Sequence, residues 1–132
     1  MQTGQATDRD IRDAAPAAFR AFFRIAEAWK LSNRQARILL GDPPESTFYK
    51  WMAGAVGVVS RDVLERLSYV LGIYKALQIL LPDPESADSW IWRPNSAAPF
   101  GGRPAAEHML SGNVADLYVV RQYLDAQRGG WP

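Results

Sequence analysis

One apolar segment, Ser60 to Leu81, constrains the fold more than any other part of the chain. At helical spacing its apolar residues cover roughly half of the helix circumference, whereas packing against one neighbour needs a stripe of only about 100°. Ser60 can cap the helix N-terminus, and Pro82 ends the segment. We therefore predict a long helix that packs against elements on both sides of it in sequence. Its apolar residues are Val63, Leu64, Leu67, Val70, Leu71, Ile73, Tyr74, Leu77, Leu80 and Leu81.

Length and composition limit the classes of protein that this chain can be. Of 132 residues 48% are apolar, enough for one domain or for two small helical modules with a shared core. No apolar run reaches the about 20 residues of a membrane span, and the first ten residues lack a secretory signal, so we expect a cytoplasmic protein without membrane contact. The absence of cysteine and the single histidine argue against disulfides, a metal site and most metalloenzymes. We expect no cofactor.

Charge is distributed unevenly along a nearly neutral chain. Residues 1–81 hold eleven Lys or Arg against eight Asp or Glu, whereas residues 82–132 hold four against six. The basic excess of the first part is compatible with a DNA-binding module but does not establish one.

The first part of the chain begins with a polar segment and continues with an aromatic helix. Residues 1–14 are expected to be flexible, because they show no apolar periodicity. A helix is predicted over Ala15 to Trp29, with Pro16 in its first turn. Its aromatic face is expected to belong to the core and comprises Phe19, Phe22, Phe23, Ala26 and Trp29.

Residues 31–54 predict two short helices joined by a tight turn. Ser32 can cap the first helix, Gly41 can end it, and Asp42-Pro43-Pro44 changes the chain direction. The inward-facing residues of the pair are predicted to be Ala36, Leu39, Leu40, Phe48, Trp51 and Met52. This pattern is typical of a helix-turn-helix, whose second helix enters the DNA major groove, but an ordinary helical hairpin with a solvated face fits it equally well.

In a helix-turn-helix, the polar residues of these two helices are candidate DNA contacts. Tyr49 and Lys50 can reach phosphates or base edges, and Arg34 and Arg37 can contact the DNA backbone from the preceding helix. The full predicted DNA-binding set is Arg34, Arg37, Ser46, Thr47, Tyr49 and Lys50. Glu45 and a single lysine on the second helix predict weak DNA affinity for one copy alone.

After Pro82 the sequence predicts a second, smaller helical part. A helical turn is expected around residues 87–92, followed by an ordered loop held by its aromatic residues, with the tryptophans as wedges between the two parts. Pro104 is predicted to begin a helix that ends at Gly112, and Asn113 to cap the last helix. The apolar face of that last helix comprises Val114, Leu117, Val120 and Leu124.

From about Trp29 to the end, the chain resembles the Xre/MbcA/ParS family of antitoxins. The resemblance is most specific in the C-terminal part, where a Trp-x-x-x-Pro-Asn, a Phe-Gly-Gly-x-Pro and a Gly-x-x-x-x-Leu pattern follow one another. These patterns are carried by Trp90, Pro94, Asn95, Phe100, Gly101, Gly102, Pro104, Met109, Gly112 and Leu117. The resemblance implies an all-α fold with a helix-turn-helix module over residues 15–81 and a toxin-binding module over residues 82–132.

The same resemblance implies a function. Antitoxins of this family are cytoplasmic homodimers that bind their own operator and block a cognate RES-domain toxin, which degrades NAD. By similarity, the last helix and the tail are expected at the mouth of the toxin's active site. Guanidinium groups can bind carboxylates there, and an indole can fill a pocket. The implied toxin-binding residues are Arg121, Asp125, Arg128, Gly129, Gly130 and Trp131.

The residues are also compatible with two other functions. The first is a helix-turn-helix transcriptional regulator whose C-terminal module senses a ligand or dimerises. The second is an enzyme, for which Ser111, His108 and Asp116 offer a weak case, because no nucleophile is visibly placed beside the histidine. The paired glycines lack the context of a phosphate-binding loop and indicate turns.

Overall fold

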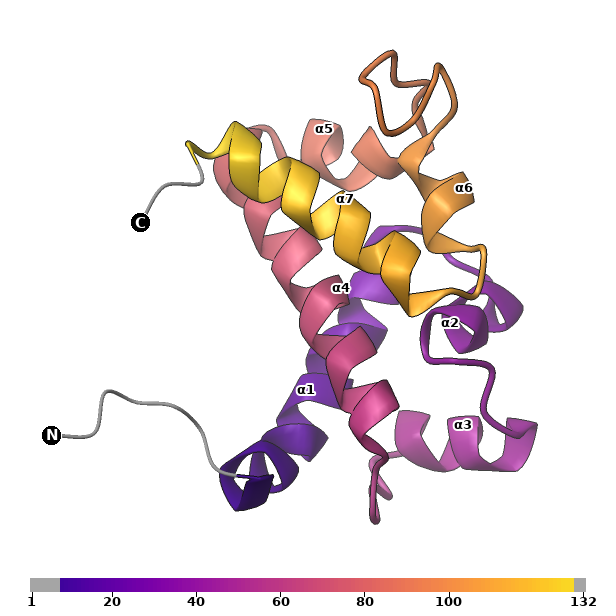
Figure 1. Ribbon diagram of the computed structural model, residues 1–132. Coiled ribbons are helices and arrows are strands. Elements are labelled where there is room, and N and C mark those ends of the chain that lie inside the picture. Colours follow the sequence, from indigo (N-terminus) through magenta and orange to yellow (C-terminus); the bar gives the residue numbers. More distant parts are fainter. Residues whose placement is uncertain (1–7, 130–132) are drawn as a thin grey trace, which may run out of the picture.

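The computed structural model describes residues 8–129, in which the regular structure is helical, as expected from the sequence (Figure 1). Within that range, Pro94 and Pro104 form an isolated antiparallel β-bridge. The elements in chain order are α1 (Asp8–Ala28), α2 (Asn33–Leu39), α3 (Glu45–Met52), α4 (Arg61–Leu80), α5 (Pro84–Ser89), the 3₁₀ helix η1 (Trp90–Trp92), α6 (Ala105–Met109) and α7 (Val114–Gln127).

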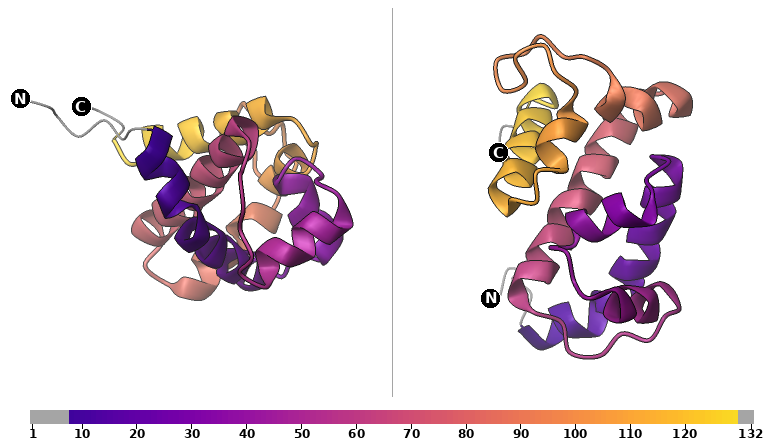
Figure 2. Two further views of the ribbon diagram at one scale, coloured as in Figure 1. Left: turned by 90° about the horizontal axis from the view of Figure 1, so that it is seen from below. Right: turned by 90° about the vertical axis from the view of Figure 1, so that its right-hand side faces the viewer.

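Helix α4 runs through the molecule and packs against both parts of the chain. It contacts α1 on one side and α7 and α5 on the other, and Figures 1 and 2 show α7 crossing it opposite the N-terminal helices. The hydroxyl of Ser60 accepts a hydrogen bond from the amide of Val63 at 3.2 Å, which caps the helix as predicted. The residues of α4 that are buried are Val63, Arg66, Leu67, Val70, Ile73, Ala76 and Leu77.

Helix α1 differs from its prediction at its N-terminus. It begins at Asp8 instead of Ala15, so residues 8–14, which were expected to be flexible, are helical. Pro16 therefore lies inside the helix and not in its first turn. Residues 1–7 lie outside the described part of the chain.

The aromatic face of α1 forms the core of the N-terminal part, as predicted. Phe19 and Phe22 are buried, and Trp51 of α3 lies against Phe19 with 4.7 Å between ring centroids. Phe48 is also buried, but Met52 is 40% exposed, so the prediction that it faces inward was wrong. Met52 is the last residue of a helix of two turns and lies at the edge of a shallow hollow between α1, α2 and α3.

Arg66 of α4 joins the two parts of the chain and is buried. Its Nε atom donates to Asp62 at 2.9 Å, and its Nη2 atom donates to the carbonyl oxygen of Gly112, in the turn before α7, at 3.0 Å. The same side chain packs against Gly41, where an added Cβ atom would lie 3.1 Å from Nε. One guanidinium thus contacts the turn after α2, its own helix and the C-terminal part.

A second link between the parts comes from the tryptophans of η1. The indole nitrogen of Trp92 donates to the carbonyl oxygen of Trp29, at the end of α1, at 2.9 Å. Trp92 therefore lies between the two parts, as predicted. Trp90 instead packs within the C-terminal part, against Phe100 and Tyr123. The helical segment before it starts at Pro84, earlier than predicted, because Asp83 caps it.

We predict that Arg66→Ala lowers the free energy of unfolding by about 2–3 kcal/mol, because it leaves the carbonyl of Gly112 without its charged donor. Asp62→Ala is the matched control, and should cost less than about 1 kcal/mol because Asp62 is largely exposed. Urea denaturation followed by circular dichroism measures both changes. Equal losses in the two variants would contradict the role assigned to the link with Gly112.

Candidate DNA and partner interfaces

The turn between α2 and α3 is built by local interactions. Ser32 and Gln35 form a reciprocal capping box at the start of α2. Gly41 and Asp42 both adopt left-handed backbone angles, with φ of 91° and 57°, which turn the chain towards α3. The guanidinium of Arg37 donates to the carbonyl oxygen of Pro43 at 3.0 Å and pairs with Asp42 at 3.4 Å. These contacts fix the angle between the two helices.

The outer face of α3 carries most of the predicted DNA-binding residues. Ser46 and Lys50 are exposed, Thr47 is half-buried, and Tyr49 is 45% exposed. Together they form a polar surface on a helix whose Phe48 and Trp51 face the core. This arrangement leaves side chains on α3 free to approach a nucleic-acid groove.

Helix α2 contributes less to this surface than the sequence predicts. Arg34 is exposed and remains available for a backbone phosphate. The Arg37 side chain is only 17% exposed and is held by the turn, so in this structure it orients α3. Asn33, which sequence reasoning did not single out, donates to the phenol oxygen of Tyr49 at 3.3 Å and links the start of α2 to α3. The signal that could have identified Asn33 is its position as a short polar residue directly after the helix cap Ser32.

The C-terminal residues that carry the family resemblance build a loop. The amide of Gly102 donates to the carbonyl of Asn95 at 2.8 Å, and the Asn95 side chain accepts from the amide of Ala97 at 2.9 Å. Gly101 and Gly102 both have left-handed φ values, 58° and 89°. Phe100 is buried at the base of this loop. The loop is thus ordered and held by an aromatic residue, as predicted.

Two further predictions concern the start of α7. Asn113 occupies the N-cap position but makes no side-chain capping bond, so the predicted cap was wrong. The side-chain Nδ2 of Asn113 donates to the carboxylate of Asp116 at 3.5 Å, and the hydroxyl of Ser111 donates to the same carboxylate at 2.6 Å. His108 packs edge-on against Phe100, and no hydrogen bond among the described residues joins it to Ser111. The arrangement does not form a catalytic triad.

The predicted toxin-binding residues on α7 include one that is tightly positioned. Arg121 donates from Nε to both oxygens of Asp125, at 3.2 and 3.0 Å. Its guanidinium lies over Gly72 of α4, where an added Cβ atom would overlap Nη1. A glycine inside a helix lowers the stability of the helix. At position 72 the absence of a side chain makes room for the guanidinium of Arg121. Arg128 and Gly129 are exposed at the end of α7, whereas Gly130 and Trp131 lie outside the described residues.

Two tyrosines lie close to Arg121. Tyr118 is 47% exposed and packs against Tyr69 of α4 with ring centroids 5.7 Å apart. Tyr69 donates a hydrogen bond to Glu65 at 2.8 Å, which raises the pKa of the Tyr69 phenol. Arginine and tyrosine are the residue types that most often anchor protein interfaces. Tyr118 was missed because it falls on the polar side of the predicted helix.

Comparison with known proteins identifies both parts of the chain. Residues 7–72 match the antitoxin Xre-like helix-turn-helix domain, and residues 76–130 match the antitoxin Xre/MbcA/ParS C-terminal toxin-binding domain. The chain belongs to the Xre/MbcA/ParS family of antitoxins. It is also 54% identical over 115 residues, covering 87% of each chain, to a Sinorhizobium fredii (strain NBRC 101917 / NGR234) protein named "Uncharacterized protein y4oB".

This family assignment gives the general function of the antitoxin. It is one partner of a toxin–antitoxin system, its C-terminal part binds a toxin, and both matched domains regulate and bind without catalysing a reaction. Within residues 8–129, no helix has the length and apolar character that crossing a membrane requires. Across the same residues, no group of three or more His, Cys, Asp or Glu side chains is arranged to hold a metal ion.

We predict that the effect of Gly72→Ala on stability depends on Arg121. In the wild-type background the gain in helix propensity, about 1 kcal/mol, is offset because the guanidinium must move off the helix and its pair with Asp125 is disturbed. In an Arg121→Ala background the same substitution should stabilise the antitoxin by about 1 kcal/mol. Denaturant titration of the four proteins measures this coupling. An equal gain in both backgrounds would show that Gly72 does not accommodate Arg121.

Proposed function

We propose that this antitoxin inhibits a RES-domain, NAD-degrading toxin and represses its own operon as a cytoplasmic homodimer. The observation that carries the proposal is that one helix, α4, joins a domain with an exposed polar α3 to a domain of the toxin-binding family. The C-terminal motif from Trp90 to Leu117 supports the toxin class by its resemblance to antitoxins of RES toxins.

DNA binding is proposed to involve the exposed residues of α3 and Arg34 of α2. Lys50 is the only lysine or arginine on α3, and Glu45 at its start repels phosphate. One copy therefore offers few phosphate contacts. A homodimer doubles the number of contacts and reads two half-sites of an operator. This requirement connects operator binding to the oligomeric state.

Lys50→Ala should weaken binding to the DNA upstream of the antitoxin's own gene and reduce the slope of log K against log salt by about one. Lys75→Ala, which removes an exposed lysine from α4 in a part of the chain remote from α3, is the matched control and should leave both quantities unchanged. Fluorescence anisotropy at several salt concentrations measures them. If Lys50→Ala binds with wild-type affinity and slope, α3 does not contact DNA through this residue.

Toxin inhibition is proposed to depend on the end of α7 and the residues after it. Arg128 is exposed there, and Arg121 is held in one orientation by Asp125 and Gly72. Fixed guanidinium groups suit the carboxylates or phosphates of a nucleotide-binding pocket, because they bind such groups with two parallel hydrogen bonds. Trp131 would supply an aromatic anchor beyond them.

Deletion of residues 129–132 should release toxin activity while leaving the antitoxin folded, because α7 ends at Gln127 and every buried core residue of the described range, 8–129, lies before that end. Trp131→Ala separates the ring from the rest of the segment, and Lys50→Ala is a control that should inhibit fully. The measurement is NAD consumption by the purified cognate toxin with each protein. Full inhibition by the truncated antitoxin would exclude the segment as the inhibitory element.

A further inference from the structure

The hydroxyl group of Tyr49 on α3 accepts a hydrogen bond and leaves its own proton unused. Nδ2 of Asn33, the first residue of α2, donates to this oxygen at 3.3 Å. Within residues 8–129 the Tyr49 hydroxyl donates to no acceptor, and the side chain is 45% exposed. A phenol can donate one hydrogen bond while it accepts another. The O–H bond of Tyr49 is therefore available to a group outside this chain.

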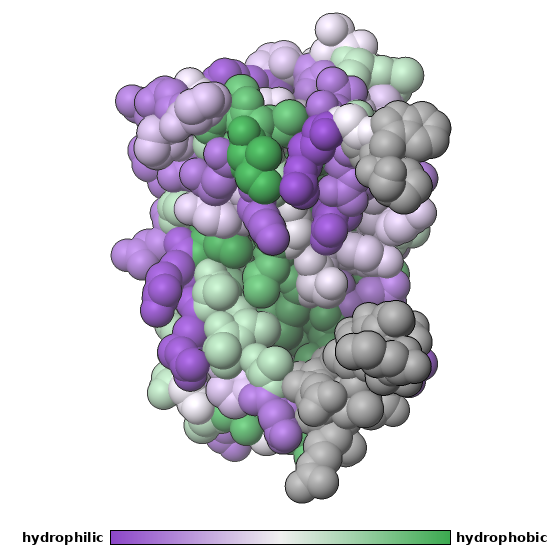
Figure 3. Space-filling view, turned by 90° about the vertical axis from the view of Figure 1, so that its left-hand side faces the viewer, coloured by the Kyte–Doolittle hydropathy of each residue, from purple (hydrophilic) through white to green (hydrophobic). Residues whose placement is uncertain are grey.

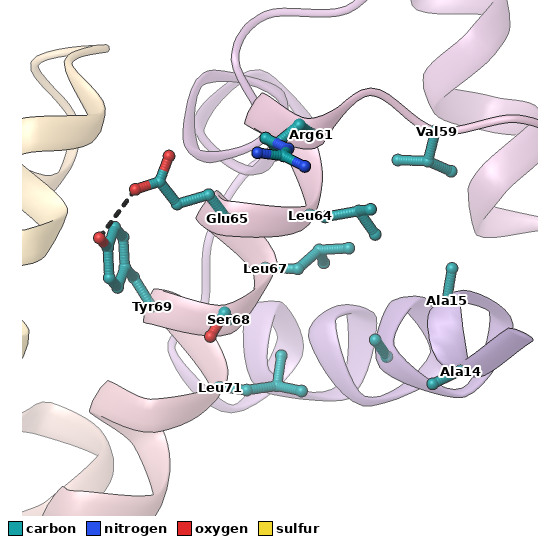
Figure 4. A pocket seen from close by; sticks show the side chains of 11 residues that line it. Ala14, Ala15, Val59, Arg61, Leu64, Glu65, Leu67, Ser68, Tyr69 and Leu71 are labelled. Carbon is teal, nitrogen blue, oxygen red and sulfur yellow. Dashed lines mark hydrogen bonds between the residues drawn. The ribbon is translucent and has the colours of Figure 1, made fainter. Parts of the chain in front are cut away.

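Tyr69 on α4 shows the opposite arrangement. Its hydroxyl donates to the carboxylate of Glu65 at 2.8 Å, as the dashed line in Figure 4 shows, so its proton is already used within the same helix. The amide nitrogen of Asn33 instead donates, and it has no lone pair that could accept the proton of Tyr49. The chemistry of the neighbouring group thus decides which of these two tyrosines can donate to a partner.

The ring of Tyr49 is held at both ends. At its base it packs edge-on against Phe48, with 5.4 Å between the ring centroids and an interplanar angle of 75°. Phe48 is completely buried and belongs to the core. At the other end, the bond from Asn33 ties the hydroxyl to α2. A side chain that is ordered before binding loses less conformational entropy when it binds, so this hydroxyl is positioned in advance.

The place of this pair in the helix-turn-helix favours a DNA phosphate as the acceptor. In this motif the second helix lies in the major groove and the first crosses the DNA backbone. The bond from Asn33 draws the Tyr49 hydroxyl towards the start of α2, and therefore towards the side on which the backbone passes. Asparagine and tyrosine side chains are both frequent donors to phosphate oxygens.

The surface around the pair suits an anionic partner. Ser46 and Lys50 on α3 and Arg34 on α2 are exposed. The large apolar surface lies elsewhere, because Figure 3 shows an apolar band on the left-hand side of the molecule in Figure 1, whereas α3 lies at its right. The open groove drawn in Figure 4 is lined by α1, α4 and the loop between α3 and α4. The polar face of α3 is thus separate from the apolar face.

We propose that the Tyr49 hydroxyl donates to a phosphate of the DNA backbone and that Asn33 is the residue that positions it. The inference rests on the operator binding of the proposed function and adds a positioning residue to it. A hydroxyl is an uncharged donor, so this contact adds affinity without the release of a counterion. On a helix whose only lysine or arginine is Lys50, it supplies a phosphate contact that charge does not.

The first experiment removes the hydroxyl alone. Tyr49→Phe should weaken binding to the DNA upstream of the antitoxin's own gene about tenfold, as expected for one hydrogen bond to a charged group. The slope of log K against log salt should stay at the wild-type value, whereas Lys50→Ala reduces it by about one. Fluorescence anisotropy at several salt concentrations measures both quantities.

Tyr123→Phe is the matched control for this experiment. It removes a hydroxyl from the C-terminal part and keeps the ring that packs against Trp90 and Phe100, so DNA affinity should not change. Wild-type affinity of Tyr49→Phe would overturn the proposal, and so would a tenfold loss that is matched by Tyr123→Phe.

The second experiment reverses the hydrogen bond from Asn33. In Asn33→Asp, a carboxylate of nearly the same shape accepts the proton of Tyr49, as Glu65 accepts that of Tyr69. An acidic residue in the first turn of a helix preserves the fold of α2. The variant should bind DNA more weakly because a donor is lost and because the new charge repels phosphate.

A Tyr49→Phe background separates these two effects, because only the repulsion remains there. Asn33→Asp should therefore cost about tenfold less affinity in the Tyr49→Phe background than in wild type. Equal costs in the two backgrounds would show that Asn33 does not position the hydroxyl.

The third experiment identifies the acceptor. Upstream duplexes are prepared in which one phosphate at a time is replaced by an uncharged methylphosphonate. At one position the replacement should weaken binding of wild type, and should weaken binding of Tyr49→Phe at least fivefold less, because the two changes remove the same contact. If no position behaves in this way, the acceptor is not a phosphate and the proposal fails.

The variants also distinguish a failure of this inference from a failure of the proposed function. If wild type binds the upstream DNA and Lys50→Ala weakens this binding, but Tyr49→Phe does not, only the inference is wrong. If wild type inhibits the toxin but does not bind the upstream DNA, the repressor part of the proposed function is wrong, and the inference fails with it.

Discussion

The structure depends on the width of the apolar surface of α4. A helix with a narrow apolar stripe has one buried side, but the arc of α4 is wide enough for α1 and α7 to pack against it at once. Burial of apolar area is the main driving force for folding, so neither neighbour alone satisfies this helix. Two modules with separate functions therefore share one core. Near Ala14 and Ala18, α1 leaves part of the apolar surface of α4 uncovered, and this opening follows from the same excess of apolar surface.

The residues that define the family and the residues proposed to contact partners have different roles in this fold. Gly101 and Gly102 allow a left-handed turn, and Phe100 closes the loop against Trp90. Such residues identify the architecture, because few others satisfy the same backbone angles or fill the same space. Ser46 and Lys50 on α3 and Arg128 after α7 are exposed and have no comparable role in packing, whereas Arg121 is held by Asp125 and Gly72. The proposed contacts with DNA and toxin therefore lie partly outside the residues that determine the packing of the fold.

The sequence predicted the helices, because caps, prolines and apolar periodicity act locally. It did not predict which polar side chains would form hydrogen bonds with other residues of the same chain. Arg37 was expected to be available to DNA, but the turn it precedes brings the carbonyl of Pro43 within reach. Asn113 had the right position for a cap, but Asp116 engages its side chain. The contact between Gly72 and Arg121 was not predicted either, although Gly72 is a glycine inside a predicted helix.

Two of the hydrogen bonds that join the modules have one property in common, whereas a third, from Gln78 of α4 to Asp88 of α5, links two side chains. Arg66 and Trp92 both end on main-chain oxygens, those of Gly112 and Trp29, and not on side chains. Every amino acid supplies such an oxygen, so the acceptor survives any substitution that preserves the local backbone. Evolution can therefore exchange the outward-facing residues of one module without rewriting the other. The exposed surfaces of the two modules can in this way change independently, while the joint between them stays the same.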